Sequence, residues 1–216
     1  MSKLNINAGD LINKINQDQD IDESQLTYYH GLITENLRSN NNKITRNSYI
    51  LIISISLYFF ILFDKTNISN ISLSFFKIQD DTLLLNFIPI VFAFVYLRNI
   101  TLWNNNINLN SLFDSTSRKI FNLSLFTDTV NIIKPFSFLH HIINYQYSNQ
   151  KVKWFLKIPL ALLFLILLFG PLVFNVISIY VIIFRLPSSP LSYFSCSLIA
   201  IFSFVALIQS FNGIKG

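Results

Sequence analysis

Four stretches of apolar residues without charged side chains divide the chain, and they predict four membrane-spanning helices. They cover residues 47–63, 82–97, 158–184 and 191–211. The second stretch continues to Trp103 if Arg98 extends its charge to the membrane surface. The third contains 27 residues and would span about 40 Å as a helix, more than the roughly 30 Å of a hydrocarbon core. We therefore expect it to tilt, to bend at Gly170-Pro171 or to protrude from the bilayer.

The polar N-terminal segment, residues 1–46, predicts two short helices and a linker. Asp10 is placed to cap a helix over residues 11–16, and Asp22 begins a longer helix with a capping-box pattern. The longer helix carries one apolar stripe at helical spacing, formed by Leu26, Tyr29, Ile33 and Leu37. This stripe packs either on the protein's own central polar segment or on the same helix of a second copy. The polar run 39–42 should then break or hinge the helix before the first span.

The loop between the first two spans, residues 64–81, predicts a small β-like element. Ile71, Leu73 and Phe75 alternate with serine, which is the period of a β-strand. We expect this strand to form half of a short hairpin on the outer membrane surface.

The segment between the second and third spans, residues 104–152, predicts two helices. One covers residues 112–125 with Ser111 as its cap, and the other begins at Pro135, a residue that suits the first turn of a helix. The apolar face of the second helix fits either a helix lying at the membrane surface or a small soluble core formed with residues 23–38.

Together these elements predict an all-α polytopic membrane protein with four transmembrane helices. A short helical N-terminal region, the β-like outer loop and a helical cytoplasmic insert complete the fold. The predicted segments are 1–46, the first transmembrane pair 47–103 with its outer loop 64–81, the insert 104–152 and the second transmembrane pair 153–216.

Composition supports a membrane location, and the distribution of charge predicts how the chain is oriented in the membrane. Charged residues make up 12% of the chain, against about 25% in soluble domains, and the mean hydropathy is +0.48. Lysine and arginine concentrate before the first span and between the second and third, whereas the opposite side holds only Lys65, Lys77 and Arg185. Both termini and the insert are therefore expected in the cytoplasm. Residues 1–46 show no secretory signal pattern, so the first span should direct its own insertion.

Recognisable enzyme chemistry is absent from the sequence. It contains no dinucleotide-binding, phosphate-loop, metalloprotease or serine-hydrolase motif, and its single cysteine excludes an internal disulfide and multi-cysteine zinc sites. The predicted spans hold no Asp, Glu or Lys, which disfavours an ion-coupled transporter. Asn86, Pro89, Asn175 and Gly170-Pro171 are the main irregularities within them. We predict no catalytic residue, no cofactor and no metal site.

The fourth span carries a face of small residues at steps of three and four. Its members are Ser192, Cys196, Ala200, Ser203, Ala206 and Ser210. In a membrane, such a face allows helices to approach closely within one chain or between protomers, or it lines a pore. These three interpretations remain open from the sequence, and the last two are compatible because a ring of protomers can both pack and line a pore.

The insert contributes the remaining candidate contacts, which are basic residues and histidines. They are Arg118, Lys119, His140, His141, Lys151 and Lys153. The basic residues act either as determinants of topology or as contacts for a soluble cytoplasmic partner, a nucleotide or a nucleic acid. The adjacent histidines point about 100° apart on a helix, which favours packing over a shared sensor site for protons or nucleotides.

Two functions from different classes fit these features. The first is a small homo-oligomeric ion channel or membrane-permeabilising effector in the lipid bilayer, gated through its cytoplasmic helices. The second is a non-conducting structural or accessory subunit that docks a cytoplasmic partner. The abundance of phenylalanine and isoleucine, without a strongly hydrophilic stripe, suits the second.

The layout of the chain resembles that of the small membrane subunits of bacterial antiphage defence systems of the Hailong or Kiwa type. The shared features are a polar N-terminal helix, two spans, a basic insert of about 50 residues and two more spans. The resemblance implies that the protein works with a soluble cytoplasmic partner and damages or depolarises the membrane on infection. It is one of organisation and assigns no functional residue.

Overall fold

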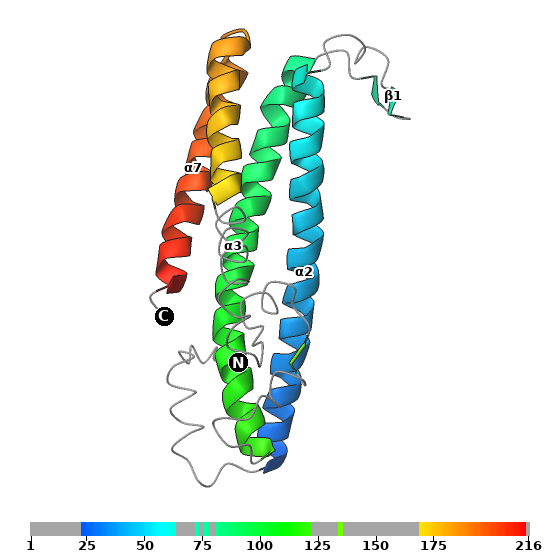
Figure 1. The fold of residues 1–216 in the computed structure, drawn as a ribbon, viewed down its shortest axis with the longest axis vertical. Coiled ribbons are helices and arrows are strands. Elements are labelled where there is room, and N and C mark those ends of the chain that lie inside the picture. The colour runs from blue at the N-terminus through cyan, green and yellow to red at the C-terminus, as the bar shows by residue number, and fades with distance from the viewer. Residues whose placement is uncertain are drawn as a thin grey trace, which may run out of the picture. The chain divides into compact units, whose positions relative to one another are not determined.

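The computed structural model describes residues 23–63, 72–73, 76–77, 81–121, 134–135 and 169–214. Its helices are α2 (Glu23–Phe63), α3 (Asp81–Ile120), the helix Phe169–Arg185 and α7 (Pro190–Ile214) (Figure 1). Between α2 and α3, strands β1 (Ser72–Leu73) and β2 (Phe76–Lys77) pair antiparallel. The predicted helix 11–16 lies outside the described residues, as does the second insert helix beyond Pro135.

α2 is one helix of 41 residues, so the break predicted at residues 39–42 is wrong. The prediction relied on the weak helix propensity of Ser and Asn, which tertiary contacts can override. Here Asn106 Nδ2 donates a hydrogen bond of 2.8 Å to Asn41 Oδ1. The polar run thus has an interhelical partner that its local sequence does not reveal.

α3 is also one continuous helix, of 40 residues, and it includes Pro89. It passes Trp103 without interruption, so the separate helix predicted to begin at Ser111 is wrong. The helix ends at Ile120 with a turn in which the Phe121 N–H bonds the Ser117 carbonyl at 3.0 Å. Apolar residues after the asparagine-rich stretch pack on α2, and this contact sustains the helix where propensity alone predicted a loop.

The apolar helices are those of an integral membrane protein. α2, α3 and α7 are each long and apolar enough to cross a membrane. The helix Phe169–Arg185, the described part of the predicted third span, is apolar but shorter. Large apolar side chains on all four helices are more than half exposed, including Ile53, Phe87, Val176 and Phe204. Such a surface is unusual for a soluble monomer and suits contact with lipid.

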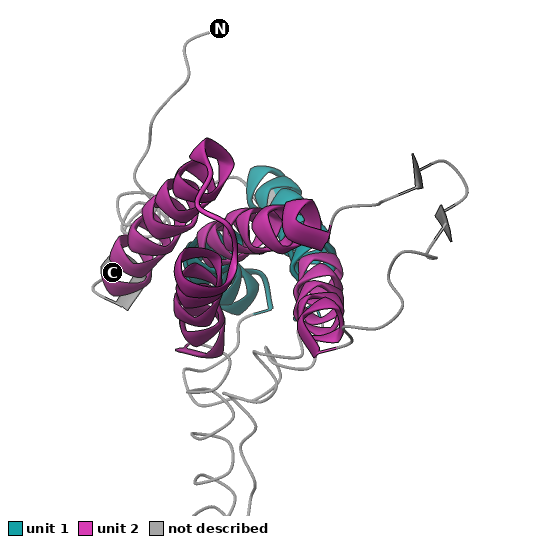
Figure 2. Ribbon diagram, turned by 90° about the horizontal axis from the view of Figure 1, so that it is seen from above, with its two compact units in different colours: residues 1–44, 102–144 teal, residues 45–101, 145–216 magenta. Residues whose placement is uncertain are grey.

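The chain divides into two compact units (Figure 2). Unit 1 comprises residues 1–44 and 102–144, and unit 2 comprises residues 45–101 and 145–216. The described part of unit 1 comes from α2, α3 and residues 134–135. That of unit 2 comes from α2, α3, the helix Phe169–Arg185 and α7, together with the short β-pairing.

Unit 2 has an apolar core rich in aromatic rings. Its largest cluster joins α2, α3 and the helix Phe169–Arg185 through Tyr58, Ile61, Leu85, Ile88, Phe92, Phe174 and Val181. Two further clusters add α7, one through Ala93, Ile182 and Ile199 and the other through Tyr96, Ile100 and Ala206. The two alanines are fully buried, and their small side chains allow the close helix approach that stabilises membrane bundles.

In unit 1, α2 and α3 form an antiparallel pair. Residues later in α2 pair with residues earlier in α3, since His30 contacts Thr116 whereas Asn41 contacts Asn106.

The apolar stripe predicted on the N-terminal helix lies at this interface. Leu26, Ile33 and Leu37 are buried, whereas Tyr29 is exposed. Ile33 and Leu37 pack against Phe113, with Leu109 and Leu112 beside them. Of the two predicted uses of the stripe, packing on the protein's own central segment is therefore confirmed for these two residues.

Candidate functional site

A hydrogen bond between an asparagine and a serine joins two helices of unit 2. Asn175, on the helix Phe169–Arg185, is 1% exposed, and its Nδ2 donates to Ser203 Oγ of α7 at 2.7 Å. Ser203 Oγ in turn donates its own proton to the Ile199 carbonyl at 2.7 Å. Because that proton is used, Ser203 can only accept from Asn175, which fixes the amide nitrogen toward α7. The Asn175 Oδ1 atom is left buried without a hydrogen-bond partner in the described part of the chain.

Tyr58 of α2 brings a third helix to the same region. Its side chain is fully buried, and its hydroxyl lies near Ser178 and Cys196. No hydrogen bond to that hydroxyl is formed by any residue that the structure describes. Ser178 donates its own proton to the Phe174 carbonyl at 2.9 Å. Three helices carry these buried or partly buried polar side chains. We call them the polar cluster: Tyr58, Asn175, Ser178, Cys196 and Ser203.

Aromatic rings close the core beside the polar cluster. The Phe174 ring centroid lies 5.2 Å from that of Tyr58 and 4.3 Å from that of Phe92. Both Tyr58 and Phe92 are fully buried, and Phe174 is nearly so. The rings occupy the space between α2, α3 and the helix Phe169–Arg185, so unit 2 is densely packed at this level.

The small-residue face predicted on the fourth span lies partly in the packed interface of α7. Ser192 and Ala206 are buried, Ala200 is exposed, and the others are partly buried: Cys196, Ser203 and Ser210. The buried face also includes Ser195 and Ile199, which the predicted stripe omits. The buried face of α7 is therefore displaced around the helix from the predicted one, and it includes Ile199, a large side chain that a pattern of small residues could not include.

Sequence reasoning did not assign the polar cluster as a site. Asn175 was visible as a polar irregularity in a long apolar stretch, and this was the usable signal. Tyr58 gave no signal, because tyrosine is common in membrane spans and its burial depends on the neighbouring helices.

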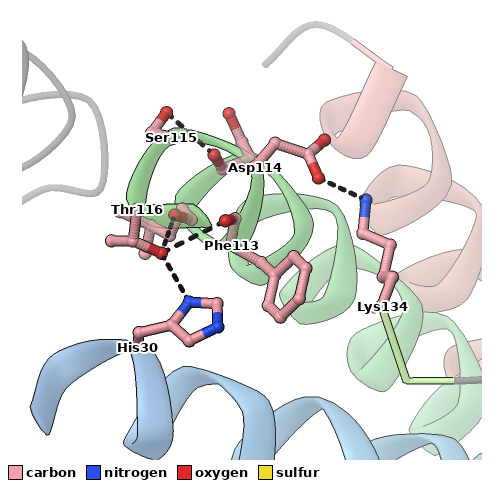
Figure 3. A network of polar contacts seen from close by, with 8 residues as sticks. His30, Phe113, Asp114, Ser115, Thr116 and Lys134 are labelled. Atoms are coloured by element: carbon pink, nitrogen blue, oxygen red, sulfur yellow. Dashed lines mark hydrogen bonds and ion pairs between the residues drawn. The ribbon is translucent and has the colours of Figure 1, made fainter. Parts of the chain in front are cut away.

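Unit 1 contains a second polar network, between α2 and α3 (Figure 3). His30 Nδ1 lies 3.1 Å from Thr116 Oγ1, and its ring lies 4.8 Å from that of Phe113. Thr116 donates its single hydroxyl proton toward the carbonyls of Leu112 and Phe113, at 2.9 and 3.1 Å. When the Thr116 proton is directed to one of these carbonyls, Thr116 accepts from His30 in the tautomer that carries the proton on Nδ1. Burial lowers the pKa of His30 from its ordinary 6.5, so the imidazole is neutral at pH 7.

Lys134 connects the chain beyond α3 to the same network. Its ammonium lies 2.7 Å from Asp114 Oδ1 and 5.8 Å from the centre of the Phe113 ring (Figure 3). The Lys134 side chain is 5% exposed, so its charge depends on this carboxylate and on the ring face.

The candidate ligand contacts of the insert are only partly described. Arg118 and Lys119 lie in the last turn of α3, where cations interact favourably with the helix dipole. Four further candidates lie outside the described residues: His140, His141, Lys151 and Lys153. Within the described ranges, no group of three or more His, Cys, Asp or Glu residues could hold a metal ion.

Comparisons with known protein families, curated proteins and solved structures find no match to this chain.

Proposed function

We propose that this chain is a small homo-oligomeric membrane effector that forms an ion channel or permeabilises the membrane. In this proposal four helices cross a bacterial inner membrane, both termini lie in the cytoplasm and unit 1 controls opening. The positive-inside distribution of lysine and arginine supports the orientation. An antiphage role, together with a soluble cytoplasmic partner, follows from the resemblance in layout and belongs to the same proposal.

The polar cluster is the observation that carries this proposal. Asn175 Oδ1 and the Tyr58 hydroxyl are buried without hydrogen-bond partners among the described residues. Each such group costs about 1–3 kcal/mol when it loses water and gains no partner. Water entering this region would satisfy both groups. The cluster therefore has the chemistry of a conduction path held in a closed, dry state.

In this proposal two aromatic rings, those of Phe174 and Phe92, close that path. Phe174 and Phe92 fill the core next to the cluster, at a ring separation of 4.3 Å. No charged residue lies between 47 and 63, 82 and 97, 169 and 184, or 191 and 211. Opening therefore requires movement of apolar rings and needs no ion pair within these stretches to break.

A non-conducting accessory subunit is the second candidate, and the Asn175–Ser203 bond favours it. Interhelical hydrogen bonds from Asn and Ser commonly hold membrane helices together without any path for ions. In this alternative the same hydrogen bond only holds the helix Phe169–Arg185 against α7, and the chain docks its partner through unit 1.

Removal of the Phe174 ring distinguishes a channel from a non-conducting accessory subunit. We expect Phe174→Ala to make potassium-loaded liposomes leak, because the truncated side chain opens space beside the unpartnered polar groups. Phe184→Ala is the matched control, since this phenylalanine of the same helix is 71% exposed. Potassium efflux is measured on protein that elutes as a single species in detergent, and the mass of that species gives the oligomeric state.

Phe92→Ala provides an independent variant if Phe174→Ala does not fold. A folded ring-removal variant that leaks no faster than the Phe184→Ala control would overturn the channel proposal in favour of the accessory subunit. A leak that adding Asn175→Leu suppresses would support the polar cluster as the path.

A further inference from the structure

We infer that Arg46 of α2 and Arg98 of α3 bind the headgroups of anionic phospholipids at one surface of the membrane. In the proposed orientation this is the cytoplasmic surface. The inference concerns unit 2 alone, and it does not depend on whether the chain conducts ions.

The two arginines lie at one level of unit 2. Arg46 lies 17 residues before the end of α2, and Arg98 lies 17 residues after the beginning of α3. Ile61, near that end of α2, and Leu85, near that beginning of α3, pack in the same apolar cluster, so these two helix ends lie close together. At 1.5 Å per residue, both arginines lie about 26 Å from these ends, close to the roughly 30 Å thickness of a hydrocarbon core.

Other polar groups mark the same level as a membrane surface. Thr101 Oγ1 lies 2.8 Å from Gln209 Oε1, so exposed polar side chains of α3 and α7 meet here. Tyr49 follows Arg46 by three residues and is exposed, and tyrosine is enriched where membrane meets water. The part of unit 2 formed by α2 and α3 itself runs from Thr45 to Thr101. The compact apolar unit therefore ends where the arginines lie.

Neither arginine has a counterion on the described part of the chain. Both side chains are exposed, and neither forms an ion pair with another described residue. Asp81 is the only acidic residue in the described part of unit 2, and it lies about 26 Å from Arg98 along α3. Beyond unit 2, Glu35 lies about 16 Å from Arg46 along α2, and Asp114 about 24 Å from Arg98 along α3. These separations exceed the Debye length of about 10 Å at 0.1 M salt, so the compensating negative charge has to come from outside the described chain.

The surroundings of the arginines fit a phospholipid as the source of that charge. Ile50 lies one helical turn from Arg46 and Phe94 one turn from Arg98, each on the side of the apolar unit, and both are exposed. A phospholipid offers acyl chains to these apolar side chains and a phosphate to the guanidinium, which binds phosphate with two parallel hydrogen bonds. Lipids with a net negative charge are favoured, because a zwitterionic headgroup carries its own cation.

Native mass spectrometry of the full chain in detergent tests this inference. The protein is titrated with phosphatidylglycerol or with phosphatidylcholine, and the dissociation constant of each lipid is obtained from the bound populations. We expect the wild-type protein to bind phosphatidylglycerol more tightly. The double variant Arg46→Gln/Arg98→Gln should weaken phosphatidylglycerol binding about fivefold, which corresponds to about 1 kcal/mol for a basic residue at an anionic surface, and should leave phosphatidylcholine binding unchanged.

Two further variants show whether charge at this level is responsible. Arg38→Gln is the matched control, since Arg38 is an exposed arginine of the same helix about 12 Å before Arg46, and it should bind phosphatidylglycerol like the wild type. The double variant Arg46→Lys/Arg98→Lys keeps both charges and should retain the preference for phosphatidylglycerol.

Three results would overturn the inference: equal binding of the two lipids by the wild type, unchanged phosphatidylglycerol binding in the glutamine double variant, or an equal loss in Arg38→Gln. Competition by inorganic phosphate at the lipid's own concentration would also overturn it, because the ligand would then be a soluble anion. None of these measurements involves ion flux, so a failed channel proposal leaves the lipid inference standing.

Discussion

At the scale of a single residue, His30 shows how burial makes a side chain sensitive to pH. Its Nδ1 proton is held by Thr116, and its ring packs on Phe113 in the interface of α2 and α3. Because burial lowers the pKa of the folded state below 6.5, the unfolded chain binds its proton first as the pH falls. The contribution of His30 to stability is therefore present above pH 6.5 and is lost progressively below it.

A glutamine at this position tests that reasoning. His30→Gln keeps an N–H donor for Thr116 but cannot be protonated, so it removes the pH dependence and retains a hydrogen bond. We expect the wild-type protein to lose thermal stability relative to His30→Gln between pH 7 and pH 5. The measurement is the difference in unfolding temperature of the two proteins in detergent across this range. A difference that stays constant with pH would show that His30 is not protonated on unfolding.

The polar cluster illustrates the limit of sequence reasoning at the same scale. An asparagine within a long apolar stretch makes position 175 unusual in the sequence alone. Its partner Ser203 is 28 residues away, and Tyr58 lies on another helix. Which polar atoms remain unpartnered depends on how three helices pack, and the sequence of one helix does not contain that information.

At the scale of helices, charge-free apolar stretches located the membrane elements well. The predicted fourth span, 191–211, lies within α7, and the predicted first span ends with α2 at Phe63. The continuity of α2 and α3 was missed, because polar runs within these helices were interpreted as breaks or loops. Residues 39–42 continue α2 through an interhelical contact of Asn41, and such contacts are invisible to local propensity.

Two substitutions at Asn42 test whether this run is helical in solution. Asn42 lies inside α2 and is exposed, so neither new side chain enters the packed interface. We expect Asn42→Pro to destabilise the protein by about 3 kcal/mol, because proline removes a helix hydrogen bond and clashes with the preceding turn. Asn42→Ala should be neutral or slightly stabilising, since alanine has the higher helix propensity.

Circular dichroism at 222 nm during thermal unfolding in detergent reports both effects. If residues 39–42 formed a linker, Pro and Ala at this position would give the same helix content and the same unfolding temperature. That result would contradict a continuous α2.

At the scale of the whole molecule, the number of crossings decides the topology. α2, α3 and α7 are long and apolar enough to cross a membrane, whereas the described part of the third predicted span is shorter. Our proposal includes four crossings, because the apolar stretch 158–184 contains 27 residues, more than the about 20 needed to cross a bilayer. An even number of crossings after the insert returns the C-terminus to the side of the insert, and an odd number does not.

Reporters fused at three positions distinguish these arrangements. With four crossings, a reporter at Asn122 and one after Gly216 should both lie in the cytoplasm, whereas one at Asn70 should lie outside. The expected orientation follows from the concentration of lysine and arginine before the first span and in the insert, which holds these segments on the cytoplasmic side. Alkaline phosphatase and green fluorescent protein fusions at each position give opposite signals on the two sides of the membrane. A C-terminal reporter opposite to Asn122 would show that one of the two predicted spans after the insert does not cross. Inverted signals at all three positions would contradict the orientation while preserving four spans.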